Sequence, residues 1–129
     1  KVRGMEVEAN WSLKHWNINT NYTFTEKVGQ APLRLPKHAA NIGLNYAAPK
    51  TQWGLHWRYI GKRYDVNPAF TQEKLDAYAL VDARIAFPDF IGNTTASLAV
   101  TNVFDVEYTE IFGFTTLGRN LNIALRYAF

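Results

Sequence analysis

The sequence RNLNIALRYAF, residues 119–129, alternates between polar and apolar side chains. Its apolar face carries Leu121, Ile123, Leu125, Tyr127 and Phe129. Period-two alternation of this length predicts a β-strand with one apolar and one polar face. The segment also matches the roughly 9–11 residues that a tilted strand needs to cross a bilayer. Because it ends on an aromatic ring suited to a membrane–water boundary, we predict the closing strand of a transmembrane β-barrel.

The same alternation recurs in six earlier segments of the chain. These predicted strands cover residues 4–11, 16–25, 39–47, 52–60, 78–87 and 94–103. Their connections alternate between short turns, at 14–15, 49–50 and 88–93, and long loops, at 26–38, 61–76 and 105–118. A membrane meander has tight turns at one end and loops at the other. The predicted fold class is therefore all-β: a segment of an antiparallel up-and-down transmembrane β-barrel with about seven strands.

The two faces of these strands differ in charge. The apolar face of all seven predicted strands has no charged residue, and an arginine or lysine there would cost about 2–4 kcal/mol at the bilayer midplane. The predicted lumen-facing charges are on the other face: Glu6, Glu8, Arg58, Asp82, Arg84 and Arg126. We expect Asp82, Arg84 and Arg126 to form a ladder of ion pairs along a wet lumen.

Composition excludes several classes of protein. The 129 residues suffice for one domain, and the net charge of +3 comes from scattered residues without a basic run, so we expect no nucleic-acid partner. No cysteine is present, which excludes disulfides and thiolate metal sites. No stretch approaches the roughly 18 apolar residues of a membrane helix, whereas alternation conceals barrel strands from averaged hydropathy. Because the chain opens within a strand pattern, we expect it to be part of a longer protein.

A soluble β-sandwich is the main alternative, because it also has short strands with one polar face. The positions of the aromatic residues favour the membrane. One group lies near the short turns: Trp11, Trp16, Tyr46, Trp53, Phe87 and Phe129. A second group lies near the long loops: Tyr22, Phe24 and Tyr59. Two such belts are expected at the two bilayer interfaces. Seven strands are an odd number, so we expect either a larger barrel or closure with other copies.

Several motifs resemble a known family. The segments 75–87 and 97–129 resemble the C-terminal end of TonB-dependent outer-membrane receptors. The family's N-x-F-D-x-x-Y segment and the Gly-Arg before its last strand match Asn102, Phe104, Asp105, Tyr108, Gly118 and Arg119. Two weaker matches are a G-x-E-x-E strand and a P-x-H-x-x-N segment, at Gly4, Glu6, Glu8, Pro36, His38 and Asn41.

The resemblance implies a 22-stranded barrel of the bacterial outer membrane, with a plug in its lumen. Residues 1–129 would be its C-terminal part, with the last strands and three extracellular loops. The plug and the box that binds TonB are expected outside these residues. The implied function is uptake of ferric siderophores or cobalamin, energised through TonB. The implied partners are the bilayer and lipopolysaccharide, the rest of the barrel and plug, TonB, and the barrel assembly machinery, which would read the apolar face of residues 119–129. Alternatives are a self-assembling structural pore or, less favoured, a soluble β-sandwich binding module.

Ligand contacts are expected in the loops, because exposed loops of barrel receptors carry recognition. The candidates are Arg63, Tyr64, Phe70, Tyr108, Phe112 and Phe114. The simpler interpretation is that most of these aromatic rings anchor the loops at the outer interface. His38 and His56 lack the spacing of a metal site, and no nucleophile–base pair or phosphate loop is present. We therefore expect no catalytic residue, no metal and no cofactor.

Overall fold

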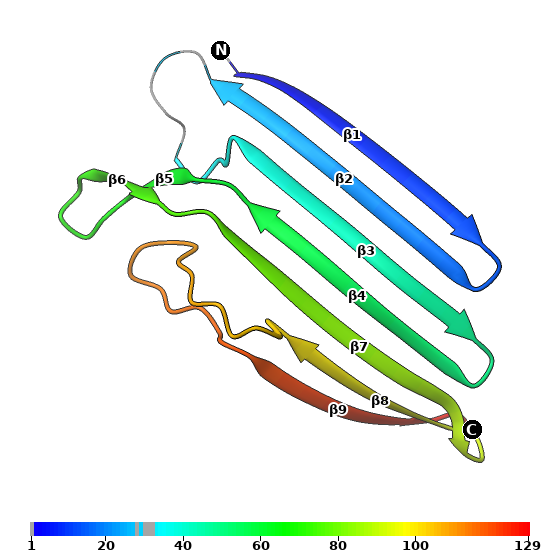
Figure 1. Cartoon of the computed structure of the whole chain (residues 1–129). Coiled ribbons are helices and arrows are strands. Elements are labelled where there is room, and N and C mark those ends of the chain that lie inside the picture. The colour runs from blue at the N-terminus through cyan, green and yellow to red at the C-terminus, as the bar shows by residue number, and fades with distance from the viewer. Residues whose placement is uncertain (1, 28, 30–32) are drawn as a thin grey trace.

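The chain forms one long antiparallel sheet and one short hairpin in a computed structural model that describes residues 2–27, 29 and 33–129. The sheet order is β1-β2-β3-β4-β7-β8-β9, and β5-β6 form the hairpin. The strand bounds are β1 Val2–Leu13, β2 Trp16–Lys27, β3 His38–Ala48, β4 Thr51–Ile60, β5 Arg63–Val66, β6 Gln72–Leu75, β7 Tyr78–Ile91, β8 Thr94–Thr101 and β9 Asn120–Tyr127. Figure 1 shows a single curved layer with all three long connections at the same end.

The predicted up-and-down meander of seven strands is confirmed, since each strand of the large sheet pairs with its neighbour in antiparallel register. The sandwich alternative is wrong, because among the described residues no second sheet covers either face of this layer (Figure 1). The buried apolar side chains among the described residues are only Leu75, Tyr78 and Leu80, at the loop end. The described part of the chain also contains no helix of the length and apolarity of a membrane span.

Two differences from the predicted strands lie in the predicted turns and loops. The first is β7, which continues to Ile91 through the predicted turn at 88–93, with a register shift between Phe87 and Ile91. Pro88 lies in this irregular part, where a missing N–H donor breaks no ladder hydrogen bond. The second is the hairpin β5-β6 inside the predicted long loop at 61–76. Its turn depends on Asn67, whose Oδ1 accepts hydrogen bonds from the backbone N–H groups of Ala69 and Thr71, both at 2.9 Å. Part of the predicted loop at 26–38 lies outside the described residues.

The register fixes which residues share a face of the sheet. One row opposes Glu8 to Asn21, Asn21 to Asn41, and Asn41 to Arg58. Because directly opposed residues point the same way, this row defines the polar face. The remaining predicted lumen charges fall on it through the pairs Glu6↔Thr23, His56↔Asp82, Gly54↔Arg84 and Thr95↔Arg126.

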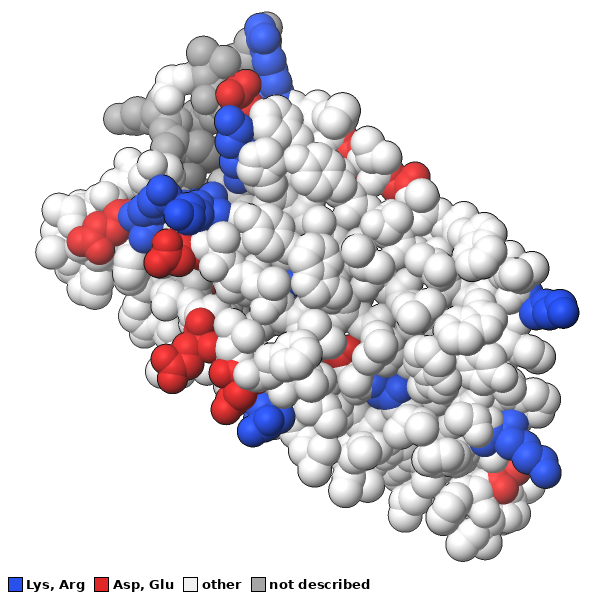
Figure 2. Space-filling view, in the orientation of Figure 1, with Lys and Arg blue, Asp and Glu red and all other residues white. Residues whose placement is uncertain are grey.

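The opposite face is apolar and uncovered. One of its rows runs across the whole sheet through Trp11, Ile18, Leu44, Leu55, Ala83, Val100 and Leu121. Leu55, on the central strand β4, keeps 45% of its surface exposed, and Ile123 on β9 keeps 71%. In the view of Figure 2, charged side chains gather toward the two ends of the strands and the area between them is mostly uncharged. Such a continuous apolar surface needs lipid or protein to cover it.

The apolar face nevertheless carries charge at its loop end, contrary to the prediction. Strands β1 and β2 extend beyond their predicted bounds, and their last pairs include Arg3↔Glu26. This pair lies two residues beyond Met5↔Phe24, so Arg3 and Glu26 share the apolar face. His38 joins them opposite Phe24. The apolar face is therefore uncharged along the middle of the strands, as predicted, and carries charge where β1 and β2 reach the loop end.

Candidate functional site

The three long connections meet at one end of the sheet (Figure 1). The first connection touches the second through a parallel bridge between Leu33 and Tyr64. The backbone N–H of Arg34 donates to the Tyr64 carbonyl at 2.6 Å. Backbone contacts thus fix the end of the first loop along strand β5.

A single carboxylate joins all three loops. Asp65 of β5 is completely buried. Its Oδ1 accepts a hydrogen bond from Arg34 Nε at 2.8 Å, and its Oδ2 accepts one from the Phe112 backbone N–H at 2.9 Å. The Arg34 side chain and then the Phe112 N–H hold the pKa of Asp65 below its ordinary value of 3.8, because both favour the charged carboxylate. We call Arg34, Asp65 and Phe112 the loop clasp.

Alternation along β5 explains why its polar residues face inward. Arg63 and Asp65 are buried, whereas Tyr64 between them is exposed. The Arg63 Nη2 donates to the carbonyls of Thr109 at 2.7 Å and Glu110 at 3.2 Å. Its guanidinium also lies 5.3 Å from the centre of the Tyr78 ring. Arg63 therefore ties the second loop to the third.

The third loop has no strand of its own and is held by side chains of the N-x-F-D-x-x-Y segment. Asn102 is buried and exchanges two hydrogen bonds with Val106, of 2.9 and 3.0 Å. Its backbone N–H donates to Asp82 Oδ1 at 2.8 Å. Asp105 accepts the Arg119 N–H at 2.6 Å, which joins the start of the loop to its end. A Cβ at Gly118 would lie 2.8 Å from Asp105 Oδ1, which explains the small residue there.

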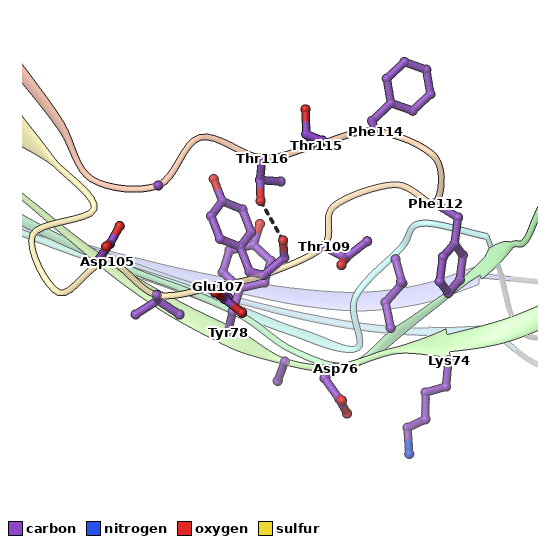
Figure 3. Close-up of a pocket in the computed structure, with 15 residues that line it drawn as sticks. Lys74, Asp76, Tyr78, Asp105, Glu107, Thr109, Phe112, Phe114, Thr115 and Thr116 are labelled. Atoms are coloured by element: carbon purple, nitrogen blue, oxygen red, sulfur yellow. Dashed lines mark hydrogen bonds between the residues drawn. The ribbon is translucent and has the colours of Figure 1, made fainter.

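A cavity of about 760 Å³ lies between the third loop and the junction of β6 and β7 (Figure 3). The rings of Tyr78 and Tyr108 pack within it, with their centres 4.4 Å apart. Thr116 closes one side by donating its hydroxyl to the Tyr108 carbonyl at 2.6 Å, as drawn in Figure 3. Carboxylates of Asp105 and Glu107 also line the cavity. The arrangement offers aromatic surface together with polar groups, as small-molecule sites do.

The structure separates the six loop candidates into groups. Three of them line the cavity: Tyr108, Phe112 and Phe114. Phe114 is 73% exposed and points away from the loop toward solvent (Figure 3). Phe70, in the turn between β5 and β6, is 92% exposed and lies outside the cavity lining. Tyr64 is partly exposed on β5, and the Arg63 guanidinium is buried against protein carbonyls. Ligand contact by these residues stays a prediction.

The predicted ladder of ion pairs along the polar face is wrong. Among the described residues the ion pairs are Arg34–Asp65 and Lys37–Glu26. Asp82 instead accepts the Asn102 N–H, so its carboxylate fixes the start of the third loop rather than bracing Arg84. Two open depressions of about 390 and 140 Å³ hollow the polar face and share Asn19, Gly43 and His56.

The remaining candidates lie on the two faces as follows. His38 is on the apolar face opposite Phe24, and His56 is on the polar face opposite Asp82, so the two histidines cannot share an ion. No group of three metal-ligating side chains occurs within the described ranges.

The predicted assembly signal lies on the exposed apolar face of β9 at Leu121, Ile123, Leu125 and Tyr127, followed by Phe129. The Phe129 ring packs edge-on against Tyr127 at 5.3 Å.

Sequence reasoning missed Arg34 and Asp65, the polar centre of the loops. The available signal was the alternation in the RYDV segment, which marks Arg63 and Asp65 as one face of a strand. Nothing in the sequence identified Arg34 as their partner, because that residue lies 31 positions away.

Comparison with known proteins matches this chain to receptor barrels. The family model described as TonB dependent receptor-like, beta-barrel matches residues 1–103. The ferripyoverdine receptor of the outer membrane of Pseudomonas aeruginosa, bound to ferripyoverdine, matches 98% of this chain at 26% identity with a TM-score of 0.78, over 19% of its own length. The ferric-catecholate import receptor Fiu of E. coli K12 matches 96% at 22% identity (TM-score 0.76), over 20% of its length. The copper transporter OprC matches 99% at 19% identity (TM-score 0.76), over 23% of its length. The chain thus spans about a fifth of these proteins, and the last two likenesses concern the fold alone.

Proposed function

This chain belongs to the family of TonB-dependent receptor-like β-barrels, and from that membership we propose that it serves in the uptake of a ferric siderophore. Members of the family are transport proteins of the bacterial outer membrane, not enzymes. We propose that residues 1–129 are the C-terminal part of a barrel of 22 strands. The rest of that barrel, a plug and TonB would be its partners, and the barrel assembly machinery would recognise strand β9.

One observation carries the choice of ligand. The ferripyoverdine receptor shares 26% identity over 98% of this chain, and the shared region includes all three long loops. Cobalamin is the alternative ligand. The copper transporter has the same fold and a different transported substrate. An iron–siderophore complex is the class that the sequence likeness favours.

The loops support this proposal physically. The loop clasp joins them through part-buried hydrogen bonds to the Asp65 carboxylate, so we expect the cavity beside the third loop to have a defined shape before a ligand arrives. A preformed cavity saves the free energy of ordering loops on binding. Tyr108 and Phe114 would supply aromatic contact area at its edge.

The test is binding and uptake by the full-length receptor that contains this chain. Cells that express it are offered iron-55 complexed with a panel of siderophores, and cobalamin in parallel. We expect one class of iron complex to be taken up in a TonB-dependent manner. The double substitution Tyr108→Ala with Phe114→Ala should weaken binding of that complex about tenfold, since aromatic residues are enriched among those whose truncation costs more than about 1 kcal/mol of binding free energy.

Phe90→Ala is the matched control, because Phe90 is an exposed phenylalanine at the turn end of β7, outside the cavity lining. It should leave the affinity unchanged. Solute conductance without uptake of any panel member would contradict the proposal and favour the structural pore. Uptake of cobalamin alone would mean that the ligand is cobalamin and not an iron–siderophore complex.

A further inference from the structure

The third loop is the most acidic of the long connections. Residues 102–118 contain neither lysine nor arginine, and their acids are Asp105, Glu107 and Glu110. By contrast, residues 61–77 balance three basic residues against three acidic ones. A group that enters between these two connections therefore meets an excess of negative charge on the side of the third loop.

Glu107 differs from the other two acids of this loop. Glu110 accepts a hydrogen bond from the Tyr78 hydroxyl at 2.8 Å, and Asp105 accepts one from the Arg119 N–H at 2.6 Å. Glu107 is exposed, and among the described residues it forms neither a hydrogen bond nor an ion pair. Because Glu107 lines the cavity beside the third loop, its carboxylate can pair with a cationic group that enters the cavity.

The cavity has one basic residue in its described lining, Lys74. Figure 3 shows the Lys74 side chain pointing away from the third loop, as does the side chain of Asp76. The guanidinium of Arg63 is buried against the carbonyls of Thr109 and Glu110 and lies outside the lining. The wall that the third loop contributes to the cavity is therefore negative.

Aromatic rings accompany the carboxylates in this lining. The rings of Tyr78 and Tyr108 line the cavity with their centres 4.4 Å apart, and Tyr108 directly follows Glu107 in the chain. A carboxylate attracts a protonated amine through a charge-assisted hydrogen bond, and the face of an aromatic ring attracts it through the cation–π interaction. The two kinds of group together suit a primary ammonium ion.

Given the proposed uptake of a ferric siderophore, we propose that Glu107, Tyr78 and Tyr108 form an ammonium subsite that binds a protonated amine of the iron complex. Three hydroxamates, each with one negative charge, neutralise iron(III), so a free amine makes such a complex a cation. Three catecholates, each with two negative charges, leave a trianion, which the carboxylates of Asp105 and Glu107 repel. The subsite therefore favours an amine-bearing ferric hydroxamate over a ferric catecholate.

The experiment measures the dissociation constants of iron-55 complexes for the purified full-length receptor in detergent, by equilibrium dialysis. The probes are a linear ferric trihydroxamate that ends in a primary amine, the same complex with its amine acetylated, and a ferric tris-catecholate. Acetylation removes one positive charge and leaves the iron centre unchanged. We expect acetylation to weaken binding to the wild type about fivefold, the usual size of a charged contact at a partly exposed site. The catecholate should bind more weakly than both hydroxamates.

Substitutions separate recognition of charge from the structure of the loop. Glu107→Gln keeps the shape of the side chain, so it should weaken binding of the amine-bearing complex about fivefold and leave the acetylated complex unchanged. Glu107→Lys should reverse the preference between the two complexes. Asp89→Asn removes the same charge from an exposed position at the turn end of β7 and should change neither affinity. Heat-modifiable migration verifies that every variant is a folded barrel.

Three results would overturn the ammonium subsite and leave the uptake of a ferric siderophore intact. They are equal affinity for the amine-bearing and acetylated complexes, equal weakening of both complexes by Glu107→Gln, and tightest binding of an iron complex that carries no amine. Binding of no iron complex in the whole siderophore panel would instead contradict the proposed function, and the subsite with it.

Discussion

The seven-stranded sheet and the loops at its end are held together in different ways. In the sheet, β1 and β2 pair residue by residue over their full length, from Val2↔Lys27 to Leu13↔Trp16. These bonds are made by the backbone and do not depend on individual side chains. In the loops, a few side chains make the connections, and Asp65 alone reaches two other loops.

The difference teaches where single substitutions can act. A sheet with a repeated backbone ladder tolerates any side chain that suits its face. A loop held by one buried carboxylate changes shape when that carboxylate is lost. The loops can therefore change shape while the sheet stays the same. The following predictions test this contrast, from the largest expected effect to the smallest.

The largest effect is expected from a charge on the wrong face of the sheet. Leu55→Arg places a guanidinium in the centre of the apolar face and should destabilise the full-length barrel by about 2–4 kcal/mol. His56→Arg, one residue later on the polar face, should cost less than about 0.5 kcal/mol because it faces an open depression. The measurement is the free energy of unfolding in lipid vesicles. Equal losses for the two variants would contradict the assignment of Leu55 to the apolar face and His56 to the polar face.

Removing the charge of the loop clasp should have the next largest effect. Asp65→Asn loses the charge-assisted bond to Arg34, and the third loop should be cleaved by protease about tenfold faster. Barrel stability should not change, because no sheet hydrogen bond is lost. Asp89→Asn, an exposed acid at the turn end, is the control. Cleavage at the wild-type rate would mean that the clasp does not hold the loops.

A smaller effect is expected from Asn102. This residue combines two hydrogen bonds to Val106 with a left-handed backbone, φ 50°. Asn102→Ala should loosen the third loop by about 1 kcal/mol, seen as faster hydrogen exchange of the Val106 amide. Asn102→Gly favours the left-handed backbone conformation but does not restore the hydrogen bonds to Val106. Its rate of Val106 amide exchange should therefore lie between the rates of the alanine variant and the wild type. Identical exchange in the two variants would show that the backbone conformation contributes nothing.

The smallest effect is expected from pH. The pKa of Asp65 is lowered in the folded chain, so the stability it contributes is present above its ordinary value of 3.8 and is lost as pH falls through the lowered pKa. Protease protection of the loops should therefore stay constant from about pH 8 to 5 and fall only below 3.8. Asp65→Asn should abolish that acid transition. Loss of protease protection near pH 6 would mean that a titrating group other than Asp65 holds the loops together.

Sequence patterns predicted the sheet well and the loops poorly, for a physical reason. Alternation along each strand is a local property, and it identified both faces and placed the six predicted lumen charges together on the polar face. It failed where a strand continued past a proline, as in β7, and where two strands extended to include Arg3 and Glu26. Strand ends depend on the pairing partner, which no local pattern contains.

The sequence by itself determined the seven strands, their order and the orientation of their side chains, because alternation along each strand and the order of the strands in the chain suffice to pair neighbours in a meander. Only the tertiary structure decided what Asp65 and Asp82 do. Their partners Arg34, Phe112 and Asn102 lie 31, 47 and 20 positions away, and the pairing of the strands brings them together. Asp65 joins the three loops, and Asp82 holds the start of the third loop. The role of each carboxylate depends on the hydrogen-bond donors around it, and these donors are distant in the sequence.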